Sequence, residues 1–433
     1  MHFRAIGKGL AGIGLSVALA GAAVLAGPAA SRAADGGTIH WLTARSQSDA
    51  AMKAIVAIAA DYKKDHPGFD LQIEYIPDRP SFLSKVRILA SSNQLPEWFD
   101  ADPEPYFADV VKNGLVIDIG KLYAELGVTD KFFPVSIGYP KFDDGSLNLI
   151  TWNANAEYFF YNKDLFQKAG VQVPKTIDEF LAACAKLKAA GITPISVDGK
   201  DQWPLLRYLA IPPFRAAGNE FLDKLKDGKV KMTDPIGIQA STFVQNLGKN
   251  SFEEGFANTD YTTALNIFTS GKAAIYYMGT WELHSFLDAN SNMLPSIGYF
   301  PMPIGGPADK SPATDFFANS GIGTAIRKGA DTPEAKEFLK YLFAHYADTA
   351  LYQYHLLPSI KPTIRPDLAK VFQDVLTDIG NVKEFTKVWD VRLDPNTVDV
   401  IGRETGSLAL GQVTPQQFGQ EIDDSVQQYV KSK

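Results

Sequence analysis

The hydrophobic pattern changes period along the first part of the chain. Apolar residues recur at helical spacing over Asp49–Lys64, and Pro67-Gly68 ends that pattern, so the segment predicts an amphipathic helix. Thr38–Leu42 before it and Phe69–Tyr75 after it predict strands, the second by strict alternation of apolar and polar residues. A strand, a helix and a strand with short connections favour a right-handed parallel crossover, which predicts an α/β fold.

The same mixture of helix and strand patterns continues to the C-terminus, with no low-complexity tract and no internal repeat. Thr176 followed by Glu179 predicts a capping box at a helix start. Further strands are expected at Glu97–Phe99, Leu147–Asn153, Tyr158–Tyr161, Ser296–Phe300 and Asn319–Ile326, and helical segments at Ser81–Ser91, Asn162–Gly170, Asp234–Phe268 and from Thr332 onward.

One stretch places a large aromatic residue just beyond a buried strand. Gly271 is expected to end a helix in the left-handed conformation, and Ala273–Met278 is an apolar run of strand length. Gly279 permits a turn, and Thr280 is expected to cap the next helix. Trp281 would then lie at the mouth of the turn, either as a flat platform for a sugar face or as packing between helix and strand.

The N-terminal 33 residues have the layout of a secretory signal. Arg4 and Lys8 are followed by the apolar, Gly- and Ala-rich run Gly9–Leu25, and Ser31-Arg32-Ala33 offers a cleavage site after Ala33. A retained membrane anchor is the alternative, but the run is only weakly hydrophobic. Cys184, the one cysteine of the chain, lies on an apolar helical stripe and is expected to be a packed hydrophobe. It is not at the expected mature N-terminus, so we expect no lipoprotein cysteine there. These features predict a soluble protein of the Gram-negative periplasm.

Length and charge narrow the function further. The chain has 433 residues, enough for two domains after cleavage, and a formal net charge of −7 that cleavage would make −10. An acidic protein with no basic tract is a poor nucleic-acid binder. P-loop, His-Glu-x-x-His and Gly-x-Ser-x-Gly motifs are absent, and none of the six histidines pairs at metal-ligand spacing. We therefore expect no catalytic residue, no metal site and no cofactor.

Several short motifs, taken in their order along the chain, resemble one known family. They are Trp41 with the helix up to Pro67-Gly68, Leu95–Asp100, Tyr161–Gly170 with Pro174–Thr176 and Glu179–Phe180, Ser270–Trp281, Gly321–Ile326 with Pro333–Leu339, and Ala409–Pro415. Together they resemble the extracellular solute-binding proteins of ABC transporters, family 1, the carbohydrate-binding type that includes maltose-binding protein. The resemblance extends from about Ile39 to Val426.

This resemblance implies a two-lobed α/β periplasmic-binding-protein fold of type II, with a three-segment hinge and the ligand cleft between the lobes. Residues 34–153 and 319–348 would form the N-terminal lobe, and residues 154–318 and 349–433 the C-terminal lobe. The chain would cross between lobes near Asn153–Glu157, Phe317–Gly321 and Tyr346–Gln353.

A neutral sugar offers C–H faces and hydroxyl edges, so its site needs flat aromatic rings and short polar side chains. Trp281 matches the stacking tryptophan of the family. Trp203 resembles a position behind the cleft that serves packing as often as contact. Trp389 lies where the family often supplies a ligand loop, with a core aromatic as the alternative, and Asp390 beside it could add a polar contact.

Further polar candidates lie in loops and at the expected crossings. Asp102 follows the third strand and would bind a sugar hydroxyl; a calcium loop lacks its glycine, a catalytic acid pair lacks the geometry, and a solvated acidic loop remains the alternative. Arg45 follows the first strand and could hold paired hydroxyls or a carboxylate, or be a surface arginine. The crossings contribute Asn153, Asn155, Asn319 and Ser320.

The sequence thus predicts a monomeric periplasmic receptor that closes on a carbohydrate and delivers it to a membrane permease. Candidates from several separated loops favour a disaccharide or a trisaccharide over a single sugar. The alternatives are a secreted glycoside hydrolase, and a binding protein of the same fold for a polyamine, iron or a phosphorylated glycerol. The acidic net charge weighs against an anionic ligand.

Overall fold

The computed structural model describes residues 37–432, so the predicted signal sequence lies outside the described residues. The first of two β-sheets has the strand order β2-β1-β3-β9. Its strands are β1 (Thr38–Thr43), β2 (Asp70–Tyr75), β3 (Trp98–Ala101) and β9 (Gly323–Ile326). β1 pairs in parallel with β2 and β3, whereas β9 runs antiparallel to β3. The parallel crossover predicted from the first strand, helix and strand is confirmed.

The second sheet has the order β5-β6-β4-β7, and β8 pairs with β4 beside this path. Its strands are β4 (Asn155–Asn162), β5 (Thr193–Ser196), β6 (Ala273–Gly279), β7 (Ile297–Phe300) and β8 (Ala318–Asn319). β6, β7 and β8 all run antiparallel to β4, and β5 is parallel to β6. β4 lies between β6 and β7, and its first six residues are all buried, the polar Asn155 and Glu157 included.

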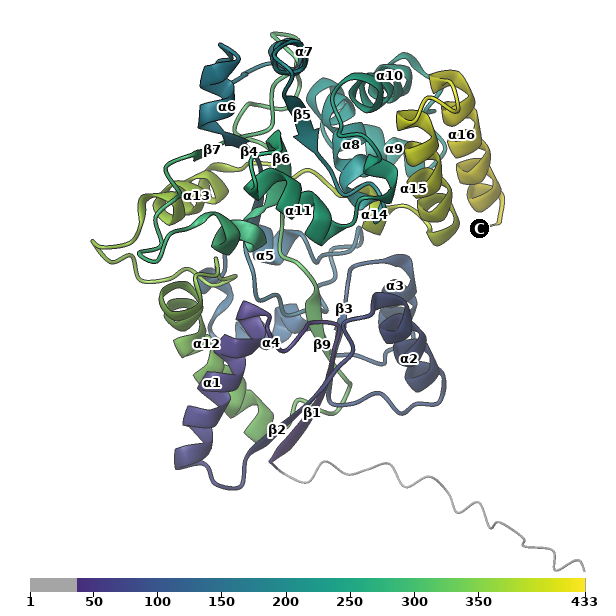
Figure 1. Cartoon of the computed structure of the whole chain (residues 1–433). Helices are drawn as coiled ribbons and strands as arrows, with labels where there is room; N and C mark the ends of the chain where they lie inside the picture. The colour runs from purple at the N-terminus through teal and green to yellow at the C-terminus, as the bar shows by residue number, and fades with distance from the viewer. Residues whose placement is uncertain (1–36, 433) are drawn as a thin grey trace, which may run out of the picture. The chain divides into compact units, whose positions relative to one another are not determined.

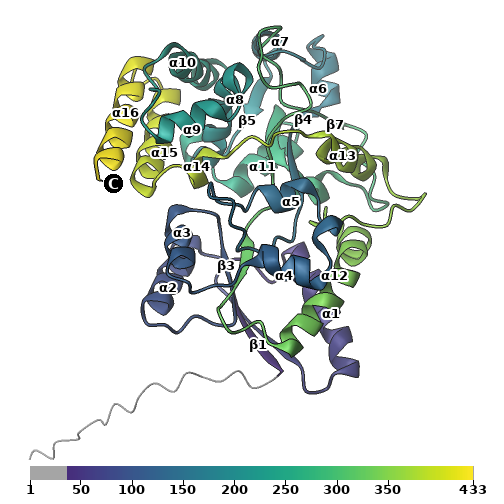
Figure 2. The same cartoon turned by 180° about the vertical axis from the view of Figure 1, so that it is seen from behind.

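Helices cover both sheets (Figures 1 and 2). In the first half of the chain they are α1 (Ala50–Asp65), α2 (Arg79–Ser91), α3 (Pro105–Lys112), α4 (Ile119–Leu126), η1 (Thr129–Lys131), α5 (Pro134–Gly138), α6 (Lys163–Lys168), α7 (Ile177–Ala189) and α8 (Trp203–Ala217). In the second half they are α9 (Glu220–Lys226), α10 (Pro235–Asn250), η2 (Phe256–Asn258), α11 (Tyr261–Thr269), η3 (Thr280–Phe286), α12 (Pro333–Tyr354), α13 (Lys370–Asn381), α14 (Trp389–Arg392), α15 (Pro395–Ala409) and α16 (Pro415–Ser432). α12 returns to pack beside α1, and α8, α10, α15 and α16 form a helical group (Figure 2).

Local capping signals place several of these helices where the sequence predicts them. Thr176 accepts a hydrogen bond from the Glu179 amide at 3.1 Å, and the Glu179 carboxylate returns to the Thr176 amide, so the predicted capping box is confirmed. Thr332 caps α12 by accepting from the Ala335 amide at 3.2 Å. Gly271 has φ +72° directly after α11, as the predicted helix end requires.

Two predicted strands are wrong in a related way. Leu147–Asn153 forms no strand and makes only isolated bridges, Ile150 with Thr324 and Asn153 with Pro358. The single strand expected at Asn319–Ile326 is two strands, β8 and β9, which pair in different sheets. Gly321 separates them with φ +64°, a conformation that glycine adopts without strain.

Three segments that are distant in sequence lie side by side where the chain passes between the sheets. The Ala154 amide donates to the Leu357 carbonyl at 3.0 Å, and the Ser359 amide donates to the Trp152 carbonyl at 2.9 Å. On the other side the Glu157 amide donates to the Phe317 carbonyl at 2.9 Å. Two of these segments include residues of the expected crossings Asn153–Glu157 and Phe317–Gly321, and their role as a hinge stays a prediction. The third expected crossing, Tyr346–Gln353, is instead the continuous last part of α12, and the extended segment begins after it.

Two apolar clusters line the first sheet, and one larger cluster lines the second. Trp41, Trp98 and Trp152 form an aromatic cluster beside the first sheet, with ring centroids 5.6 Å and 6.0 Å apart. The second sheet and its helices enclose a larger core that includes Cys184, which is 1% exposed and unpaired. Burial raises the pKa of the Cys184 thiol to about 12, so the residue is the packed hydrophobe that the sequence predicts. Within residues 37–432, no helix has the length and apolar character to cross a bilayer.

Candidate functional site

Trp281 is held in a fixed orientation at the end of β6. A Cβ atom added to Gly279 would lie 1.9 Å from the Trp281 ring, so the indole rests directly on the glycine backbone. The indole Nε1 donates to the Tyr261 hydroxyl at 3.2 Å, and that hydroxyl donates to Glu282. The ring is therefore oriented from one face and one edge, and it remains partly exposed.

The roles predicted for Gly279, a turn residue, and for Thr280, a helix cap, are wrong. Gly279 has φ −90°, an ordinary extended value, so its missing side chain makes room for the indole and does not shape a turn. The Thr280 hydroxyl does not cap η3, because it accepts a hydrogen bond from the Ala156 amide at 3.2 Å. Both residues therefore serve to tie Trp281 to β4.

Gly279→Ala should disturb the platform without changing any side chain that faces a ligand. The added methyl group requires the indole to move by more than a normal van der Waals adjustment. We expect the Kd for a bound sugar to rise by about tenfold, measured by calorimetric titration. Gly380→Ala, in α13, is the control, since an added Cβ there meets no atom within 4 Å and its backbone does not have a positive φ. An unchanged Kd in Gly279→Ala would contradict this role for the Gly279 contact.

Trp203 and Trp281 are neighbours, although they come from separate elements. Trp203 is the first residue of α8, and the two ring centroids are 6.2 Å apart with an interplanar angle of 57°. Both rings are partly exposed. Trp389 differs from them, because it is 3% exposed and stacks on Phe221 with a centroid distance of 6.1 Å. The structure therefore brings two of the three candidate rings together and places the third in the core.

A buried ionic network connects other predicted residues. Arg207 donates from Nη1 to Asp390 at 2.7 Å and from Nε to both carboxylate oxygens of Glu157, at 3.2 and 3.1 Å. Glu157 also accepts from Asn319 Nδ2 at 3.1 Å, and Asn319 Oδ1 accepts from Asn155 Nδ2 at 3.1 Å. Asp390, Asn319 and Asn155 thus belong to one hydrogen-bonded chain.

Several predicted site residues carry polar atoms that have no hydrogen-bond partner among the described residues. They are Arg45 Nε, Asn153 Oδ1, Asn155 Oδ1 and Ser320 Oγ. Each of these residues is at least nine-tenths buried, where an unsatisfied polar atom costs about 1–3 kcal/mol. Unpaired amide and hydroxyl groups near a crossing are the type of group that sugar hydroxyls can satisfy with small shifts.

Arg45 is buried together with Asp100 and Asp102, which contradicts the surface-arginine alternative. Arg45 donates from Nη2 to the Ile322 carbonyl at 2.5 Å and from Nη1 to Asp49 at 3.4 Å. Burial opposes its charge, but Asp49 and Asp100 more than offset this and raise the pKa of Arg45. Asp102 is 7% exposed, so the solvated-loop alternative is also wrong for it.

Four residues that bind or orient the candidate site residues were not predicted from the sequence: Glu157, Arg207, Tyr261 and Tyr277. Glu157 is fully buried and accepts a hydrogen bond from the Tyr277 hydroxyl at 2.9 Å. A signal for it exists in the sequence, because Glu157 is an acid within an apolar strand and Arg207 is a base within an apolar helix. Such residues are seldom buried without each other.

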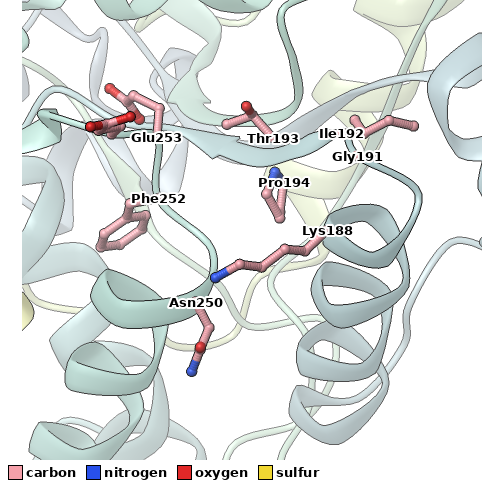
Figure 3. A pocket seen from close by; sticks show the side chains of 9 residues that line it. Lys188, Gly191, Ile192, Thr193, Pro194, Asn250, Phe252 and Glu253 are labelled. Carbon is pink, nitrogen blue, oxygen red and sulfur yellow. The ribbon is translucent and has the colours of Figure 1, made fainter.

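A surface pocket lies at the start of β5 (Figure 3). It is lined by the end of α7, the end of α10 and the start of β5, and Lys188 extends toward Asn250 and Phe252. The predicted site residues do not line it. In the described part of the chain, no group of three or more His, Cys, Asp or Glu side chains could hold a metal ion.

A family model, curated relatives and solved structures that resemble this chain are all solute-binding proteins. The model of the family "Bacterial extracellular solute-binding protein" matches residues 46–347. The multiple sugar-binding protein of Streptococcus mutans is 24% identical over 350 residues, which cover 76% of each chain. The sn-glycerol-3-phosphate-binding periplasmic protein UgpB of Rhizobium meliloti is 26% identical over 213 residues, 46% of this chain and 47% of that one. A solved chitin oligosaccharide binding protein has a TM-score of 0.78 at 22% identity, covering 92% of this chain and 100% of the other, so the two-lobed fold is shared.

Proposed function

The chain belongs to the bacterial extracellular solute-binding protein family, and from this premise we propose that it captures a neutral disaccharide or trisaccharide for an ABC importer. The observation that carries the proposal is the pair formed by Trp203 and Trp281, of which Trp281 is seated on Gly279. Flat rings held in advance lose little entropy when a sugar face stacks on them. The unpaired groups of Asn153, Asn155 and Ser320 would then bind hydroxyls.

Sugars and glycerol phosphate are both named among the relatives, and charge distinguishes them. A phosphate needs arginine or lysine donors that are free to pair with it. Here Arg207 is neutralised by Glu157 and Asp390, and Arg45 by Asp49. Asp102 adds a further buried acid. We therefore favour an uncharged ligand.

A thermal-shift comparison tests this preference. A ligand that binds the folded state raises the free energy of unfolding by mass action, by about 2.7 kcal/mol at 100 times its Kd, and thereby raises the unfolding midpoint. We expect a midpoint increase with at least one of maltose, maltotriose, raffinose and N,N′-diacetylchitobiose, and none with sn-glycerol 3-phosphate. An increase with sn-glycerol 3-phosphate alone would contradict the proposal of a neutral sugar.

Binding would act through closure about the adjoining segments at residues 153–157, 317–321 and 355–360. A ligand that contacts both sides favours the closed state by its differential affinity. Under this proposal residues 37–153 and 319–354 belong to one lobe, and residues 154–318 and 361–432 to the other, so the boundary expected after residue 348 moves to the end of α12. Micromolar capture corresponds to about −8 kcal/mol, which stacking and paired hydrogen bonds could supply after the cost of closure.

Membership in an extracellular family implies a periplasmic or extracellular location. We propose that the protein reaches the periplasm through its N-terminal signal sequence. We also propose that it is a monomer and that a membrane permease is the partner that receives the sugar. The relatives and structural neighbours described above are binding proteins, and we propose that this protein likewise returns its sugar unaltered.

A further inference from the structure

Arg207 lies at a junction between the elements that supply the candidate site. It is one turn after Trp203 on α8, is 6% exposed, and pairs with Glu157 on β4 and with Asp390 on α14. Burial lowers the pKa of the guanidinium, but Asp390 and Glu157 outweigh this effect and raise the pKa overall. Arg207 therefore keeps its charge inside the protein.

One arm of this junction reaches the segment between β8 and β9. Glu157 is fully buried and accepts from Asn319 Nδ2 at 3.1 Å. Asn319 Oδ1 in turn accepts from the Gly321 amide at 3.0 Å and from Asn155 Nδ2 at 3.1 Å. The orientation of the Asn319 side chain thus depends on a carboxylate that Arg207 neutralises. Asn319 begins the segment Asn319–Gly321 that leads from β8 toward β9, which we call the Asn319–Gly321 passage.

The other arm reaches the aromatic pair. The guanidinium carbon lies 5.1 Å from the Trp203 ring centroid and 5.7 Å from the Phe317 ring centroid. A cation over an aromatic face is attracted to the ring, and the attraction is stronger when the pair is desolvated as here. The same charge thus orients Trp203 and contacts Phe317, the residue that precedes β8.

We propose that Arg207 is a positioning residue for ligand binding, which fixes the Asn319–Gly321 passage and the Trp203 ring together without itself contacting the sugar. Its planar fork binds Glu157 and Asp390 in two directions, which a lysine cannot reproduce. The effect on affinity rests on the proposed function, whereas the effect on the passage concerns the sugar-free protein.

The same helix provides a matched control. Arg215 is 1% exposed, and its guanidinium donates to the carbonyls of Met302, Pro303, Pro312 and Asp315. It therefore anchors the loop between β7 and β8 and makes no bond to the Asn319–Gly321 passage. Arg215→Met removes an equally buried arginine from α8 and should destabilise the protein comparably.

Hydrogen–deuterium exchange of the sugar-free protein tests the first half of the proposal. In Arg207→Met, peptides that contain Glu157 and Gly321 should exchange about tenfold faster than in the wild type. In Arg215→Met, faster exchange should be confined to residues 301–315. Equal rates for the Gly321 peptide in the two variants would overturn the proposal. If Arg207→Met does not fold, Asp390→Asn replaces it, since Asp390 is partly exposed, and the same ordering is expected.

Calorimetric titration with maltotriose, raffinose and N,N′-diacetylchitobiose tests the second half. For any that binds the wild type, Arg207→Met and Arg207→Lys should raise the Kd by about tenfold, and Arg215→Met by less than about threefold. Equal Kd values in Arg207→Met and wild type would overturn the positioning role. If no sugar binds the wild type, the proposed function fails, and the exchange pattern still decides whether Arg207 positions the passage.

Discussion

Trp281→Ala raises the Kd for the bound oligosaccharide by about 30-fold, which corresponds to about 2 kcal/mol. The reason is that the indole is already oriented by the Gly279 backbone and the Tyr261 hydroxyl, so a sugar that stacks on it orders little else. Titration calorimetry measures the change. The free energy of unfolding should fall much less than for a core tryptophan, because the ring is partly exposed.

Trp281→Phe is the graded control for this result. It keeps a flat ring and loses the Nε1 donor to Tyr261 and part of the stacking area. Its Kd should lie between those of the wild type and Trp281→Ala. If Trp281→Ala binds as tightly as the wild type, the indole is packing material, and the candidate site is elsewhere.

Asp100→Ala should cost about 3–5 kcal/mol of the free energy of unfolding. Asp100 is 1% exposed and accepts hydrogen bonds from Trp41 Nε1 at 2.9 Å, from Thr324 Oγ1 at 2.9 Å, and from the Thr43 hydroxyl. Removing the carboxylate leaves these buried donors without partners. Because Thr324 is on β9 and the others are on β1, the loss also weakens the join between distant parts of the first sheet.

Urea denaturation measures this loss, with Asp118→Ala as the control. Asp118 is the N-cap of α4 and accepts from the Lys121 amide at 3.0 Å, so its removal should cost about 1 kcal/mol. Similar losses in the two variants would show that the Asp100 network contributes no more than a single helix cap.

The parts of the fold that depend on neighbouring residues could be predicted from the sequence. The Thr176–Glu179 capping box and the left-handed Gly271 each need contacts within a few residues. The split of the predicted strand Asn319–Ile326 could not be predicted, because it depends on β4 and β3, which pair with its two halves.

The candidate site shows the same division. Trp281 follows from a strand end and a family motif, both local signals. The pairing of Arg207 with Glu157 and Asp390 spans 50 and 183 residues, and no spacing rule reaches that far. The burial of Trp389 also depends on a distant partner, Phe221. Sequence alone thus identifies side chains suited to sugar binding more readily than the interactions that orient them.

The central claim is that the protein binds an intact carbohydrate. The most direct test is calorimetric titration with maltose, maltotriose, raffinose and N,N′-diacetylchitobiose. The sugar in the titrated sample is then recovered and analysed by chromatography. We predict saturable binding to one site for at least one of them, with the sugar recovered unchanged. Cleavage of the sugar, or no heat of binding from any of the four alongside clear binding of a non-sugar solute, would contradict it.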